Sequence, residues 1–176
     1  MRRRLRSAAL LALVMVPAAV ASAEPLVTVE PVTLLENGEI AGCGLTSTVA
    51  GRTASAIGEM IAFRDGDRTA FAVRARPSTA NGQAIKSVRL ATASHDTAAL
   101  FPPSKTLGDG IVESRRVLEG FSGSSFAQEL MVMGGRFEIV TTAGETIAYD
   151  LPRPMPHRVR QAYLNCAGDL FRPEAD

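Results

Sequence analysis

Two histidines, His95 and His157, are the side chains best suited to proton transfer near neutral pH. His95 precedes Asp96, but a metal site built on a His-Asp pair needs further ligands at suitable spacing, and the sequence has none. Ser124 or Ser125 could supply a nucleophile, yet the surrounding GFSGSSF lacks the GxSxG of a nucleophile elbow. The sequence therefore favours a protein without catalytic residues, metal or cofactor. The alternative is a small exported hydrolase that uses His95 or His157.

The first 23 residues have the three regions of a secretory signal peptide. A basic start, MRRRLRS, precedes the apolar run AALLALVMVPAAV, and the small residues ASA form a cleavage site ahead of Glu24. The apolar run is shorter than the roughly 20 residues that a transmembrane helix needs, which disfavours the alternative of a membrane anchor. We expect cleavage after Ala23, export to the periplasm or the medium, and a single β-rich domain over residues 24–176.

The sequence has two cysteines, Cys43 and Cys166. The AGC that ends at Cys43 resembles the end of a lipoprotein signal, but four charged residues separate it from the apolar leader: Glu24, Glu30, Glu36 and Glu39. Such a stretch does not enter the bilayer, so a lipid anchor is not expected. Because export leads to an oxidising compartment, one cysteine near each end predicts a disulfide between Cys43 and Cys166. Two free thiols are the alternative, although neither cysteine lies in a CxxC motif.

Charge and composition disfavour several classes of partner. The chain has 19 basic and 18 acidic residues, and signal cleavage removes four arginines: Arg2, Arg3, Arg4 and Arg6. A mature protein with net negative charge is not expected to bind nucleic acid. Without tryptophan and with few other aromatic residues, a stacking face for carbohydrate is not expected either. No segment after the leader is apolar enough for stable membrane insertion, so an envelope or extracellular protein is the favoured partner.

Alternating apolar and polar residues predict a mostly β fold. The segments expected to form strands are 39–50, 57–64, 68–76, 84–93, 136–142 and 145–151. The turns DGD at 65–67 and AG at 143–144 join neighbouring segments into hairpins. Ile57, Ile61 and Phe63 are expected to share one face of their strand. The predicted fold class is an antiparallel β-sandwich or barrel-like sheet, with one short helix and a C-terminal helix.

Two segments have helical periodicity instead. In SSFAQELMVMGG, residues 124–135, Ser125 and Gln128 have capping-box spacing, and the glycines predict the end of a helix of about two turns. We interpret its methionine-containing stripe as core, with a ligand-binding surface as the alternative. In PHRVRQAYLNCAGDLF, residues 156–171, apolar residues recur every three or four positions, and Arg158 and Arg160 are expected outside. The disulfide would tie this second helix to the N-terminal strand.

The segment HDTAALFPPSKTLGDG, residues 95–110, is predicted to be a long loop. Loops of this length in a compact domain are often functional. We therefore regard it as a candidate contact surface, with His95, Leu100 and Phe101 as the candidate contact residues. The alternative is that Leu100 and Phe101 fold back over the sheet as a lid.

The segment MGGRFEIVTTAGETIAYDLP, followed by a terminal helix, resembles the C-terminal half of exported proteobacterial proteins of the invasion-associated locus B type. The resemblance implies their overall plan: a signal peptide, a β-rich body of similar size and cysteine bonding. The chain lacks the tryptophan and the additional cysteines expected of that family, so no functional residue is carried over. Together with the missing catalytic motifs, this plan favours a non-catalytic, disulfide-stapled, exported binding or interaction module.

Overall fold

The structure, a computed structural model, describes residues 26–50, 55–66, 68–78, 83–118 and 121–171. The predicted cleavage site after Ala23, and Asp67 of the expected DGD turn, lie outside the described residues. The strands are β1 (Leu26–Glu36), β2 (Glu39–Ala50), β3 (Ser55–Asp65), β4 (Arg68–Pro77), β5 (Ile85–Ala91), β6 (Lys105–Thr106), β7 (Val112–Leu118), β8 (Arg136–Thr141) and β9 (Thr146–Asp150). The helices are α1 (Thr97–Leu100), α2 (Phe121–Met133) and α3 (His157–Leu170), with a short 3-10 turn, η1 (Gly108–Gly110).

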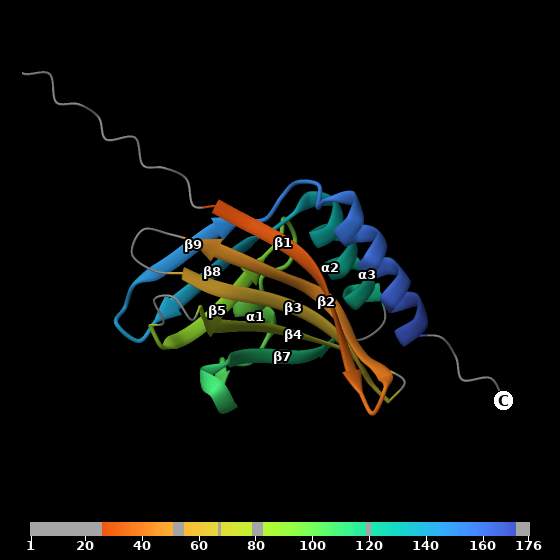
Figure 1. Ribbon diagram of the computed structural model, residues 1–176, viewed down its shortest axis with the longest axis horizontal. Coiled ribbons are helices and arrows are strands. Elements are labelled where there is room, and N and C mark those ends of the chain that lie inside the picture. The colour runs from red at the N-terminus through yellow and green to blue at the C-terminus, as the bar shows by residue number, and fades with distance from the viewer. Residues whose placement is uncertain (1–25, 51–54, 67, 79–82, 119–120, 172–176) are drawn as a thin grey trace, which may run out of the picture.

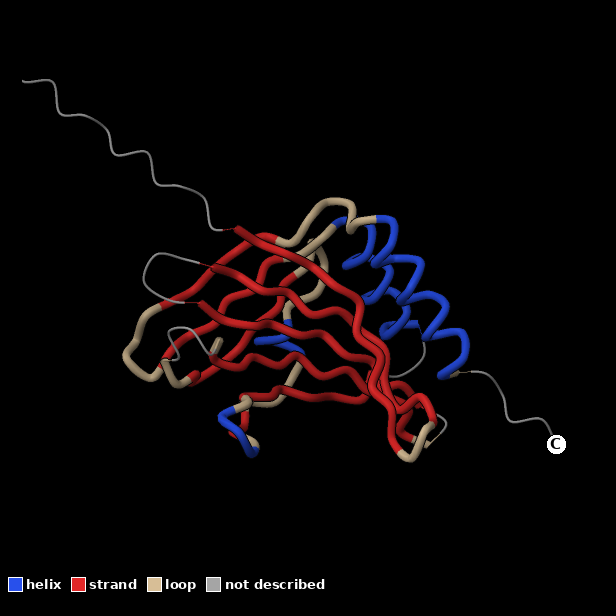
Figure 2. The backbone as a smooth tube through the Cα atoms, viewed as in Figure 1, coloured by secondary structure: helices blue, strands red, loops and turns tan. Residues whose placement is uncertain are grey.

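The strands form two antiparallel sheets that face each other as a sandwich (Figure 1). The large sheet has the strand order β1-β2-β3-β4-β7-β6, and the small sheet has the order β5-β8-β9. Buried side chains from both sheets and from the helices form one apolar core. Helices α2 and α3 lie side by side at one end of the sandwich (Figure 2). The predicted mostly β fold with a C-terminal helix is confirmed, and it takes the sandwich form.

Three strands were not predicted from the sequence: the two-residue β6, and the longer β1 and β7. Strand β1 pairs with β2 through a turn at Asn37 and Gly38, whose φ angles of 54° and 88° suit an Asn-Gly pair. Pro31 is tolerated in β1 because this strand lies at the edge of its sheet. Strand β7 pairs with β4 and contains Arg115 and Arg116 in succession, which interrupt the alternation that reveals a strand.

Strand β3 turns its small residues toward the small sheet. Ile57, Ile61 and Phe63 share a face as predicted, but that face does not belong to the main core. The core face carries instead Ala56, Gly58, Met60 and Ala62. At Gly58, a Cβ atom would stand 2.4 Å from the hydroxyl oxygen of Tyr149 in β9. The missing side chain therefore gives the tyrosine ring room to cross between the sheets.

Both predicted helices form, and the first is longer than expected. Helix α2 begins at Phe121, so Ser125 and Gln128 lie within it and the predicted capping box is wrong. The helix ends at Met133, where the next residue, Gly134, adopts a φ of 70° that glycine reaches without strain. Helix α3 has the predicted bounds to within a residue at each end and buries one stripe of side chains: Val159, Tyr163, Cys166 and Leu170.

A disulfide joins the core face of β2 to the buried stripe of α3, as predicted. The Cα atoms of Cys43 and Cys166 lie 5.7 Å apart, within the usual range for a disulfide, and both side chains are buried. The two residues are separated by 123 positions in the sequence. Because α3 packs on β1 and β2, the bond fixes the C-terminal helix to the start of the large sheet.

Removal of this bond should strongly destabilise the fold. We expect Cys43→Ala combined with Cys166→Ala to lower the free energy of unfolding by about 4–5 kcal/mol, since the unfolded chain regains the entropy of a long closed loop. Urea unfolding followed by circular dichroism measures the change. Mass spectrometry of the unreduced wild-type protein after alkylation is the control and should find neither cysteine labelled. Two labelled cysteines, or an unchanged unfolding midpoint, would contradict this account.

Candidate functional site

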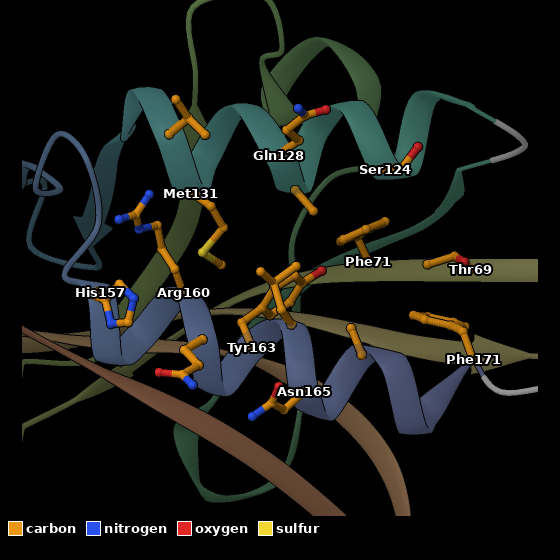
Figure 3. Close-up of a pocket in the computed structure, with 16 residues that line it drawn as sticks. Thr69, Phe71, Ser124, Gln128, Met131, His157, Arg160, Tyr163, Asn165 and Phe171 are labelled. Atoms are coloured by element: carbon orange, nitrogen blue, oxygen red, sulfur yellow. The ribbon is translucent and has the colours of Figure 1, made fainter.

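An apolar groove runs between α2 and α3 (Figure 3). Its volume is about 880 Å³, within the range of about 300–1,000 Å³ that is typical of small-molecule sites. Helix α2 forms one wall and α3 the other, and Thr69 and Phe71 of β4 lie between them. The groove is concave, mostly apolar and of suitable volume, and is therefore the candidate binding site.

The groove exists because the two helices pack on different strands. Helix α3 packs on β1 and β2, where the disulfide holds it, whereas α2 packs on β4. Small residues keep the space between the helices open: Gly123 and Ala127 on α2 and Ala167 on α3. A Cβ atom at Gly123 would stand 3.0 Å from the ring of Phe71, so even one additional carbon would crowd the groove.

Three large apolar side chains along the groove remain in contact with water. The exposed fractions are 47% for Val132, 66% for Leu164 and 37% for Phe171. Single exposed apolar residues are common on soluble proteins, but several along one concavity mark a surface that meets a ligand or a partner. The groove thus offers a hydrocarbon lining that the fold itself does not cover.

One end of the groove carries a positive charge. Arg160 and His157 lie at this end, and Phe171 lies at the other (Figure 3). The Nε atom of Arg160 is buried and has no hydrogen-bond acceptor among the described residues. The described residues that line the groove include no aspartate or glutamate. The expectation that Arg160 stays outside is wrong, because its side chain extends from α3 toward Met131 of α2.

Two further ionisable side chains line the groove, the phenol of Tyr163 and the imidazole of His157. Burial raises the pKa of Tyr163 to about 12, so its hydroxyl is neutral at physiological pH. His157, by contrast, is exposed at the start of α3. The permanent charge among the lining residues is therefore the guanidinium of Arg160.

His95 lies in a separate polar cluster that joins the turn before α1 to α2. Its Nδ1 atom is 2.7 Å from Oε2 of Glu129, and the hydroxyl of Thr92 donates to the same oxygen at 2.6 Å. Burial alone would raise the pKa of Glu129, but hydrogen bonds from Thr92, His95 and Ser94 outweigh it. The pKa of Glu129 is therefore held below its usual value, and the carboxylate stays charged.

This cluster holds only part of the machinery of a hydrolase. A histidine hydrogen-bonded to a carboxylate is the base and its orienting partner in many nucleophilic enzymes. Among the described residues, Glu129 is the hydrogen-bond partner of the His95 ring, and no hydroxyl or thiol bonds to that ring. His95 does not line the groove, and its ring packs 5.6 Å from that of Phe126. The contacts therefore fit a structural role in fixing the turn to α2.

Asp96, the second half of the His-Asp pair, supports the fold. Arg89 donates to both of its carboxylate oxygens, at 2.8 Å and 2.6 Å, and also to Glu138 at 2.7 Å. Hydrogen bonding to Arg89 holds the pKa of Asp96 below its usual value. The backbone N–H of Ala98 donates to Asp96 at 2.9 Å, so this residue also caps α1. Within the described residues, no group of three or more histidine, cysteine or carboxylate side chains is arranged to hold a metal.

The candidate contact segment at 95–110 is folded onto the core. Phe101 is only 7% exposed, and Leu100 packs against the core. Leu100 and Phe101 therefore do not extend into solvent as contact residues would. They pack against the core, as in the alternative of a segment folded back over the sheet. Short elements interrupt the expected loop: α1, β6 and η1. Contact of this segment with a partner stays a prediction.

The groove was not predicted from the sequence, although the spacing of side chains along α3 indicates a second surface that needs covering. A second stripe lies beside the buried one, displaced by one residue along the sequence. Its members are Arg160, Leu164, Ala167 and Phe171. Both stripes follow helical spacing, and a step of one residue turns the helix by about 100°, so they point in two directions. A helix with two neighbouring stripes of apolar side chains has more apolar surface than one sheet can cover. The methionine stripe on α2 is partly core, because Leu130 and Met131 are buried.

Comparison of the chain with protein-family models, with characterised proteins and with solved structures finds no match. Within the described residues, no helix has both the length and the apolar character needed to cross a bilayer.

The burial of Phe101 leads to a test of the contact segment. We expect Phe101→Ser to lower the free energy of unfolding by about 3 kcal/mol or more, because the change removes a buried ring and buries a hydroxyl. Leu107→Ser is the matched control in the same segment; Leu107 is 42% exposed, and its loss should cost less than about 0.5 kcal/mol. Thermal melts of both variants measure the difference. Equal melting temperatures would show that Phe101 does not support the core.

The depressed pKa of Glu129 predicts a pH dependence of stability. A carboxylate whose pKa is lower in the folded state stabilises the fold above its unfolded pKa of about 4.3, and this contribution disappears as the pH falls through the folded pKa. Glu129→Gln should therefore be least stable relative to wild type at neutral pH, and the difference should shrink in acid. Urea unfolding across this range measures it. Glu36→Gln, at an exposed hairpin end, should follow the wild-type profile, and a constant deficit for Glu129→Gln would refute the linkage.

Proposed function

We propose that the chain is an exported, non-catalytic binding module whose ligand site is the groove between α2 and α3. The observation that carries the proposal is a concave apolar surface of about 880 Å³ along which Val132, Leu164 and Phe171 remain exposed. Burying such side chains against a ligand is favourable by about 25 cal/mol for each Å² removed from water. A ligand with a hydrocarbon part fits this lining.

The alternative of a small exported hydrolase has less support. His95 has a carboxylate partner in Glu129 but neither a nucleophile nor a place in the groove. His157 lies at one end of the groove but is exposed, and the described lining residues include no carboxylate. A hydrolase that works through a side-chain nucleophile needs the nucleophile, its base and the substrate site in one place. The described residues separate the groove from the histidine–carboxylate pair.

Export is the second part of the proposal. The disulfide between Cys43 and Cys166 is typical of proteins that fold in an oxidising compartment. The leader at residues 1–23 has the composition of a cleaved signal peptide, and we propose cleavage after Ala23 and release into the periplasm or the medium. A location of this kind would bring the groove into contact with envelope or extracellular molecules, and an envelope protein remains a candidate partner.

We also propose a relationship to proteins of the invasion-associated locus B type. The β-rich body, the cysteine bond and the C-terminal helix support it at the level of overall plan. No residue of the groove is assigned from that family.

A neutral apolar dye tests the groove. We expect Nile red to bind the purified protein with a rise in fluorescence, and Leu164→Gln to weaken binding several-fold, which corresponds to about 1 kcal/mol. Leu35→Gln is the matched control, because Leu35 and Leu164 are both 66% exposed and only Leu164 lines the groove. Glutamine is well tolerated in helices, so α3 should stay folded.

Fluorescence titration of the three proteins gives the affinities, and sedimentation velocity gives their oligomeric state. Equal affinities for the two variants would contradict a ligand site in the groove. A wild-type dimer that dissociates on Leu164→Gln would show that a second copy covers the groove, which would also overturn the proposal.

A further inference from the structure

The second stripe of α3 begins with a cation and continues with apolar side chains. Arg160, Leu164, Ala167 and Phe171 follow one another at spacings of three and four residues, and all line the groove. At a helix rise of about 1.5 Å per residue, this stripe is about 17 Å long. It therefore offers one charged end and one extended apolar track to the same ligand.

Among the described residues, the guanidinium of Arg160 has no hydrogen-bond or ion-pair partner, although its Nε atom is buried. The described residues that line the groove include no acidic side chain. Arg158, only two positions away, shows the opposite behaviour, because it is exposed and pairs with Glu30 at 2.5 Å. The buried Nε atom is out of reach of a ligand, so an anion in the groove would meet the terminal Nη nitrogens of this partly exposed side chain.

We propose that the groove binds a free long-chain fatty acid, with the carboxylate on Arg160 and the hydrocarbon tail along Leu164, Ala167 and Phe171. This inference rests on the proposed function, and it adds the chemical class of the ligand. A guanidinium presents parallel N–H donors that match the two oxygens of a carboxylate. The tail leaves water along the exposed apolar track, which is the term that drives binding.

The charge pattern selects among amphiphiles. A cationic head group would meet Arg160 with no acidic side chain of the groove to offset the repulsion. A neutral alcohol has no charge to pair with the guanidinium and offers one oxygen where a carboxylate offers two. A carboxylate therefore gains most from the charged end of the groove.

Displacement of Nile red by three amphiphiles with the same tail tests the inference: dodecanoate, dodecanol and dodecyltrimethylammonium. Each is used below the concentration at which it forms micelles. We expect dodecanoate to compete on the order of tenfold better than dodecanol, and the cation to compete worst. Arg160→Gln should reduce the affinity for dodecanoate to that for dodecanol while leaving dodecanol unchanged. Arg158→Gln is the matched control and should keep the full preference for dodecanoate.

Circular dichroism establishes that the variants are folded, and Arg160→Lys, which keeps the charge, should retain part of the preference. Equal competition by dodecanoate and dodecanol would overturn the fatty-acid assignment and leave the apolar groove standing. The fatty-acid assignment would also be overturned if Arg160→Gln kept the preference for dodecanoate over dodecanol. The same holds if dodecyl phosphate displaced Nile red more strongly than dodecanoate did. Failure of Nile red itself to bind in the groove would overturn the proposed function as well, so the two failures are distinguishable.

Discussion

The disulfide between Cys43 and Cys166 determines where α3 lies, and the groove depends on that position. The bond attaches the buried stripe of the helix to the core face of β2, so the helix covers the start of the large sheet. Helix α2 packs on β4 instead, at the other side of the same end. Two helices held on separate strands leave a space between them, and small residues on both walls keep it open.

The same arrangement explains why apolar side chains stay exposed in a well-packed protein. The core is complete without the second stripe of α3, since Val159, Tyr163, Cys166 and Leu170 already fill the space above the sheet. Closer approach of the helices would bury Leu164 and Phe171, but it would have to move α3 away from the strands to which the disulfide ties it. The groove is thus a consequence of where the helix is fixed, and its apolar lining is available to a ligand.

The fold was largely predictable, because alternation and helical spacing are properties of local sequence. Strand β2 has the predicted bounds, and the cysteine near each end identified the contact between β2 and α3. Strand β7 was missed because its arginines lie in succession, and β1 was missed although Asn37 and Gly38 are a strong hairpin signal. The groove was less predictable, because it depends on how far apart two helices lie, and neither helix contains that information alone.

Arg160 distinguishes a ligand site from loose packing. Arginine has a long, flexible side chain that normally extends to water, as Arg158 does on the same helix. In a gap left by poor packing, the side chain at position 160 would gain hydration by leaving, and nothing would hold its Nε atom in an apolar space. Instead that atom is buried, and the chain continues toward Met131 on the opposite wall (Figure 3). The side chain is partly exposed and its positive charge lies at one end of a groove lined with hydrocarbon, so an anion bound there would gain an ion pair while its apolar part follows the track. The charged end and the apolar track are therefore best understood as two halves of one binding surface.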